Sequence, residues 1–144
     1  MSAMSDYLEN KMVDQLFRGQ TAPTTSTLYV ALLTAAPSDS GGGTEVSGGA
    51  YARVAVTSSL TNWSGTQSAG STTASSGTSG QTSNNIDITF PTPSVTWGTV
   101  THFGIYDAST GGNLLFHGAL SIAKTINESD TVTFPVGTLS VTFA

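Results

Sequence analysis

The two histidines have the most versatile side-chain chemistry in this sequence, because imidazole can bind a metal or carry a proton. His102 and His117 lie in the segments THFGIYD and LLFHGAL, which are typical of two paired strands, with Asp107 at the turn between them. A metal site requires three or more converging ligands, and a hairpin would bring only two imidazoles near each other. We therefore interpret both histidines as buried or half-buried hydrogen-bonding residues and expect no metal and no other cofactor.

The acidic side chains are scattered, and no pair has a distinctive sequence context. The dispersed carboxylates include Asp39, Glu45, Asp87, Asp107, Glu128 and Asp130. Hydrolysis of a glycosidic bond requires two carboxyl groups that face each other across a sugar-sized cleft. No serine lies in a G-x-S-x-G turn, and the Gly41–Gly43 run lacks the Gly-Lys-Ser/Thr ending of a phosphate-binding loop. The sequence therefore predicts no catalytic residue and a protein that is not an enzyme.

Four aromatic residues leave two interpretations open. Trp63 and Trp97, together with Tyr51 and Tyr106, could line a platform for a sugar ring. Core or interface packing explains the same residues equally well, because large amphipathic rings serve both purposes.

The charge distribution excludes several classes of partner. The chain of 144 residues has a net charge of -5 and only four basic residues, Lys11, Arg18, Arg53 and Lys124, which are far apart in the sequence. Nucleic acid binding and a basic membrane-surface helix both require clustered cations, so we expect neither a nucleic acid nor a membrane as partner. No apolar run approaches the ~20 residues of a membrane span.

The first 20 residues have the pattern of an amphipathic helix. Leu8, Met12 and Leu16 recur every four residues, with Val13 and Phe17 beside them, which predicts a helix over residues 6–18. Asp6 is the expected N-cap, with Glu9 at capping-box spacing, and Gly19 is the expected C-cap. The helix either packs on the β-domain that follows or docks on another subunit, since a short amphipathic helix must cover its apolar face.

The remaining residues, 21–144, predict one β-sandwich domain. The segment Thr27–Thr34 is nearly continuous apolar sequence, as in a strand covered on both faces. Further strands are predicted at the positions Tyr51–Thr57, Ile86–Phe90, Val95–Trp97, Val100–Tyr106, Leu114–Leu120, Thr131–Phe134 and Leu139–Phe143. About eight short strands with turns between them predict an all-β fold, a jelly-roll-like antiparallel β-sandwich with a short N-terminal helix.

Residues 64–85 are almost entirely Ser, Thr, Gly, Gln and Asn, and none is an apolar residue larger than alanine until Ile86. Such a segment cannot build a core of its own. Because strand patterns resume on its far side, we expect a surface excursion within the single β-domain rather than a linker between two domains.

A small set of residues is predicted to contact other proteins. Arg53 projects from one face of its strand, where pairing with an acid is favoured over a catalytic role. Together with the apolar helix residues it forms the candidate interface, which consists of Tyr7, Leu8, Met12, Val13, Leu16, Phe17 and Arg53.

Three long segments resemble a known group of proteins. Residues 7–20 (YLENKMVDQLFRGQ), 28–56 (LYVALLTAAPSDSGGGTEVSGGAYARVAV) and 102–120 (HFGIYDASTGGNLLFHGAL) are similar to small phage virion proteins that are commonly labelled tail fibre proteins. Some similar small proteins are capsid decoration, or cement, proteins. The resemblance implies a structural virion component without enzyme activity or cofactor. It also implies, from the decoration proteins, a homotrimer on the capsid surface with the major capsid protein as partner.

Two functions follow as hypotheses. The first is a capsid decoration protein that binds the outside of the major capsid shell and stabilises it. The second is a tail fibre or tail-tip component that binds a host surface receptor. We favour decoration, because a fibre shaft is usually repetitive and no internal repeat is visible here.

Overall fold

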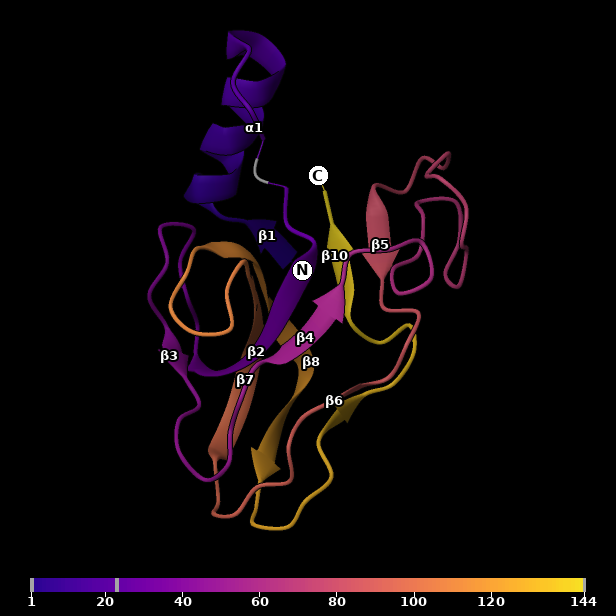
Figure 1. The fold of residues 1–144 in the computed structure, drawn as a ribbon. Coiled ribbons are helices and arrows are strands. Elements are labelled where there is room, and N and C mark those ends of the chain that lie inside the picture. The colour runs from indigo at the N-terminus through magenta and orange to yellow at the C-terminus, as the bar shows by residue number, and fades with distance from the viewer. Residues whose placement is uncertain (1, 23, 144) are drawn as a thin grey trace.

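The computed structural model describes residues 2–22 and 24–143. Met1, in the predicted N-terminal arm (1–20), and Pro23 and Ala144, in the predicted β-domain (21–144), lie outside the described residues. The described residues form one helix and ten strands (Figure 1). In chain order these are β1 (Ser2–Met4), α1 (Asp6–Arg18), β2 (Thr27–Ala35), β3 (Thr44–Glu45), β4 (Val54–Thr57), β5 (Gln81–Ser83), β6 (Ile88–Thr89), β7 (Gly98–Tyr106), β8 (Leu114–Ile126), β9 (Thr133–Phe134) and β10 (Ser140–Thr142).

The strands form one main antiparallel sheet and two small ones. The main sheet has the order β1-β8-β7-β2-β3, with β4 also paired to β2, and the small sheets are β5 with β10 and β6 with β9. Every strand pair is antiparallel. The predicted all-β antiparallel fold with a short N-terminal helix is therefore confirmed, whereas the jelly-roll strand order is not confirmed.

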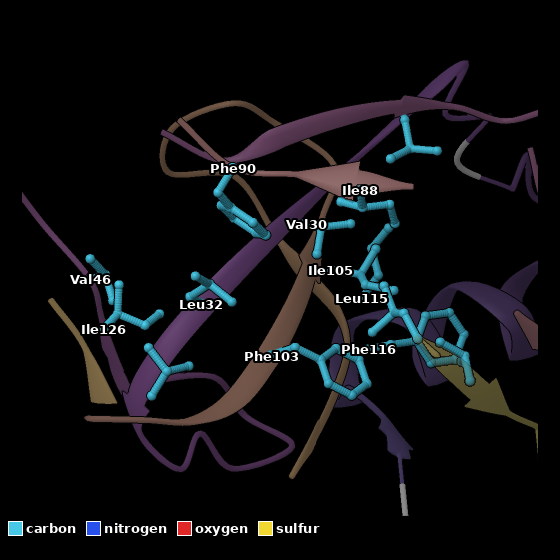
Figure 2. Packing of buried hydrophobic residues seen from close by; sticks show 14 of the residues in the cluster. Val30, Leu32, Val46, Ile88, Phe90, Phe103, Ile105, Leu115, Phe116 and Ile126 are labelled. Atoms are coloured by element: carbon cyan, nitrogen blue, oxygen red, sulfur yellow. The ribbon is translucent and has the colours of Figure 1, made fainter. Parts of the chain in front are cut away.

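The core lies between the main sheet and the small sheets. Val30 of β2 pairs with Ile105 of β7, and Leu32 pairs with Phe103, so these four side chains share one face of the main sheet. Figure 2 shows them beside Ile88 and Phe90, which come from the opposite layer, and all belong to one buried apolar cluster. Ala31 and Leu33 are also buried, which confirms that β2 is covered on both faces.

Several predicted strands differ from the observed ones. Val95–Trp97 is not a strand, because Trp97 instead anchors a loop: its Nε1 atom donates to the Gly49 carbonyl at 3.0 Å. The strand predicted from Tyr51 begins at Val54, since the Tyr51 amide closes a turn onto the Gly48 carbonyl. The predicted hairpin of two long strands is confirmed, and β8 extends beyond its predicted end to Ile126.

The N-terminal arm begins as part of the sheet, which the sequence did not indicate. Ser2, Ala3 and Met4 pair with Gly118, His117 and Phe116 of β8. The polar excursion at 64–85 is tied at its two ends, where the Ser64 amide donates to the Ser83 carbonyl at 2.9 Å and β5 pairs with β10. The predicted division of the chain into an N-terminal arm (residues 1–20) and a β-domain (residues 21–144) stays a prediction.

Candidate interaction surface

The base of α1 is fixed to the main sheet by Ser5. The Ser5 side chain accepts a hydrogen bond from the Leu8 amide and donates to the Leu114 carbonyl, while its backbone amide donates to the Leu115 carbonyl. Ser5 is therefore the N-cap, and the prediction of Asp6 was wrong by one residue. Ser5 serves better because its hydroxyl can accept from the helix and donate to β8 at the same time. Gly19 is the C-cap, as predicted, with a left-handed φ of 67°.

Some apolar residues of α1 pack against the β-domain, and others are exposed to solvent. Tyr7 and Leu8 are half-buried and pack against the core, so the predicted packing of the helix on its own β-domain is confirmed for the first turn. Beyond it the helix rises away from the sheets (Figure 1). Val13 is half exposed, Leu16 is 67% exposed and Phe17 is 82% exposed. We call these three residues the helix tip.

An exposed helix tip of this kind leaves a large favourable free energy unused. Burying a Leu or Phe side chain completely contributes about 1.5–3 kcal/mol. Leu16 and Phe17 are adjacent and Val13 lies one turn before them, so the three form a contiguous patch rather than scattered apolar atoms. Contiguous apolar patches on a surface mark sites that bind other molecules. Docking of the helix on another subunit stays a prediction. The helix tip is the part of α1 whose exposed apolar side chains are available for that contact.

Arg53 lies in an internal cluster instead of on an open surface. Its side chain is only 6% exposed, and its guanidinium forms two hydrogen bonds with the Glu45 carboxylate, at 2.9 and 2.8 Å. The same guanidinium stacks 3.7 Å from the Tyr106 ring centroid and donates to the Ala108 and Gly111 carbonyls. The predicted pairing of Arg53 with an acid is confirmed. Its proposed contact with a partner stays a prediction, although little of the side chain is accessible to one.

We call Arg53, Glu45, Tyr51 and Tyr106 the Arg53 cluster. It holds the loop between β7 and β8 through the hydrogen bonds that Arg53 donates to the Ala108 and Gly111 carbonyls. Tyr51 donates its hydroxyl hydrogen to Glu45 at 2.8 Å and accepts from the Leu32 amide at 3.0 Å. Burial raises the pKa of Tyr51, with a further contribution from the Glu45 charge. Burial alone would lower the pKa of Arg53, but hydrogen bonding and attraction to Glu45 outweigh it and raise that pKa. Both groups therefore stay in their ordinary protonation states, and the cluster acts as a structural clamp.

The histidines have separate hydrogen-bond partners. His102 Nδ1 lies 2.8 Å from the Thr101 hydroxyl, and His117 Nε2 lies 3.0 Å from Asp39 Oδ1. In the paired strands His117 is opposite Gly104 and His102 is opposite Ala119, so the two imidazoles are not direct neighbours. Their interpretation as hydrogen-bonding residues is confirmed. Within residues 2–22 and 24–143, no three His, Asp or Glu side chains are grouped so that they could hold a metal ion.

The four aromatic residues do not form an exposed platform. Trp97 is buried and packs edge-on against Tyr51, with ring centroids 5.3 Å apart, and Trp63 packs against the core. Tyr106 lies under the Arg53 guanidinium. The structure therefore supports the core interpretation over the sugar platform.

Asn84 is an organising residue that sequence reasoning missed. It is fully buried, and its side-chain amide donates to the carbonyls of Ile86, Phe134 and Pro135 while its Oδ1 atom accepts from the Leu139 amide. It thereby joins the polar excursion to β9 and β10. Its position within a run of Ser, Thr and Asn residues gave no signal of burial.

In the described part of the chain, no helix has the length and apolar character needed to span a bilayer.

Comparison with known protein families gives a match over nearly the whole chain. Residues 3–142 match the family model described as Podophage GP4 fiber I protein gp80, and this range includes α1 and the strands of the two small sheets. No curated protein matches the chain.

Proposed function

We infer the function from family membership: the chain belongs to the podophage fibre family described as Podophage GP4 fiber I protein gp80, and is thus a phage virion structural protein. From this membership we propose that it is a component of the tail fibre apparatus and that α1 attaches it to its neighbours in the particle. The observation that carries this proposal is the helix tip, which projects from a base fixed to the sheet and leaves Leu16 and Phe17 in solvent. It acts by binding, without catalysis and without a cofactor.

The fixed base explains how a small helix can serve as an attachment element. Association is weakened by the entropy lost when mobile groups become ordered. Here the Ser5 contacts with β8 already hold the first turn, and the Asp6 amide donates to the Asp39 carbonyl at 2.9 Å. Less ordering therefore remains to be done when the helix tip meets its partner, and more of the apolar burial contributes to affinity.

A second function is supported by the shape of the domain. We also propose, as the alternative, a decoration protein that binds the major capsid protein on the outside of the shell. A single β-domain with one projecting helix suits a surface plug as well as a fibre knob, and the sequence has no repeat that would build a shaft.

Copy number and location on the particle separate the two functions. Phage lacking this protein would be complemented with the wild type, with Leu16→Asp, and with the matched control Gln15→Asp, which adds the same charge on another face of the helix. The fibre function predicts a handful of copies per particle, with immunogold label at the tail. Hundreds of copies over the shell would establish decoration instead.

The same particles test the attachment element. We expect Leu16→Asp to reduce incorporation by about tenfold or more, which corresponds to about 1.4 kcal/mol of binding free energy. Gln15→Asp should be incorporated normally. Equal incorporation of the two variants would show that α1 is not the attachment element.

A further inference from the structure

A groove of about 400 Å³ opens between the second half of β8 and the strands β9 and β10. Buried Phe103 and Leu139 form part of its lining, with Leu120 and Phe134 beside them. Ile122, which also lines the groove, is 72% exposed. Cavities of roughly 300–1,000 Å³ bury drug-sized ligands, so the groove has room for large apolar side chains.

The edge of β8 that borders this groove is shaped to receive side chains rather than an added strand. β1 pairs with β8 only from Phe116 to Gly118, and no described strand pairs with that edge further along. Between the pairs His102–Ala119 and Val100–Lys124, β8 carries extra residues, which makes a bulge at 120–123. Bulges and lysines at sheet edges hinder the pairing of a further strand. A helix that presents side chains is therefore a better occupant than an extended peptide.

The helix tip of the same chain has the matching chemistry but cannot reach this groove. Leu16 and Phe17 lie roughly 15 Å along the helix axis from Asp6, at a rise of 1.5 Å per residue. Figure 1 shows α1 rising from its base beside β1, so that its far end lies beyond the sheets. Each chain thus carries two apolar surfaces that it cannot bring together.

Their charges are also complementary. Among the described residues that line the groove, Lys124 alone carries a charge. Arg18 and Arg53 pair with Asp14 and Glu45, whereas Lys124 has no acidic partner among the described residues. On α1, exposed Glu9 lies one turn before Val13 on the same face, so an acidic side chain accompanies the helix tip.

We propose that the helix tip of one copy of this chain inserts into the groove of a second copy, with Glu9 close to Lys124. This inference rests on the proposed function and names the partner of its attachment element. Because the two contacting surfaces differ, the interface is heterologous and builds a ring or an open chain of copies. The homotrimer implied by the resemblance would be one such ring.

Mixing two defective variants tests the head-to-tail arrangement. Leu16→Asp keeps an intact groove, and Ile122→Asp keeps an intact helix tip; both positions are exposed, so both variants should fold, as circular dichroism would verify. In sedimentation velocity the wild type should form oligomers and each variant should be monomeric. An equimolar mixture should form only heterodimers, because one functional interface remains. Gln15→Asp should behave as the wild type.

The outcomes distinguish this inference from the proposed function. A wild type that stays monomeric up to its solubility limit, or variants that form no heterodimer on mixing, would overturn the helix-in-groove contact. If Leu16→Asp is nevertheless lost from particles, the attachment role of α1 stands and its partner is another virion protein. Self-association combined with normal incorporation of Leu16→Asp would instead support the contact and remove the proposed function.

A charge exchange tests the polar part of the contact. Glu9→Lys and Lys124→Glu should each weaken self-association by about threefold, as expected for one exposed ion pair. A chain that carries both substitutions should recover, since each interface again joins opposite charges. Failure of the double variant to recover would show that Glu9 and Lys124 do not meet.

Discussion

Replacing Arg53 with methionine should lower the free energy of unfolding by about 3 kcal/mol. Removal of one partner from a buried ion pair costs about 3–5 kcal/mol, because the other charge is left without compensation. Glu45 retains 26% side-chain exposure, so water can solvate part of its carboxylate, and the lower end of that range applies. The substitution also frees the Ala108 and Gly111 carbonyls from their hydrogen bonds.

Urea unfolding gives the measurement, with the m-value compared between variants to exclude a change in the denatured state. For a domain of this size the loss corresponds to a decrease in Tm of about 10 °C. Arg53→Lys should recover only part of the loss, since an ammonium group cannot form the two parallel bonds to Glu45. Arg18→Met is the control, because Arg18 is 71% exposed and its pair with Asp14 is 3.5 Å long. Its expected cost is below about 0.5 kcal/mol.

The reasoning is refuted if Arg53→Met costs no more than Arg18→Met. A double-mutant cycle with Glu45→Gln then assigns the free energy to its source. We expect the Arg53→Met and Glu45→Gln costs to be strongly non-additive, because each substitution removes the same contact. Additive costs would mean that Arg53 stabilises the protein through Tyr106 and the loop carbonyls instead of through Glu45.

Three further predictions concern buried or half-buried residues. Asn84→Ala should cost about 2–4 kcal/mol in urea unfolding, because it leaves buried carbonyls and the Leu139 amide without partners. Gly104→Ala should cost about 1–3 kcal/mol, since the added Cβ would lie 2.8 Å from the Tyr106 ring; an unchanged Tm would contradict this. The raised pKa of Tyr51 means that the native state holds the phenolic proton more tightly, so stability should fall as pH rises above about 10. Tyr51→Phe should make that alkaline decline shallower, as unfolding at about pH 9 and about pH 11 would show.

The sequence predicted those elements whose signal is a local pattern of apolar residues. The helix over residues 6–18 follows from apolar spacing and β2 follows from a continuous apolar run, and both were found with nearly the predicted bounds. The short strands β4, β6, β9 and β10 were predicted too long, because alternation continues into loops that tertiary contacts hold in other conformations. Periodicity carries no information about such contacts.

The interaction surfaces, too, were only partly predictable from the sequence. The apolar residues of α1 were visible in the sequence, but which of them face solvent depends on how Ser5 sets the helix on β8. The groove was invisible, because its lining comes from β1, β7, β8, β9 and β10, which are up to 140 positions apart. Likewise, an acidic partner was expected for Arg53, but only the turn before β4 brings Glu45 to it.

The loop clamped by Arg53 and the base of α1 belong to one structural unit. Tyr106 and Asn113 line the same cavity as Ser5 and Tyr7, so the loop between β7 and β8 and the first turn of the helix border one cavity. A helix of 13 residues is marginal in water by itself, and α1 has no fully buried residue to hold it. Its direction must therefore come from its base. It follows that damage to the Arg53 cluster should weaken docking by the helix tip as well as folding, although no residue of that cluster belongs to the helix tip or lines the groove.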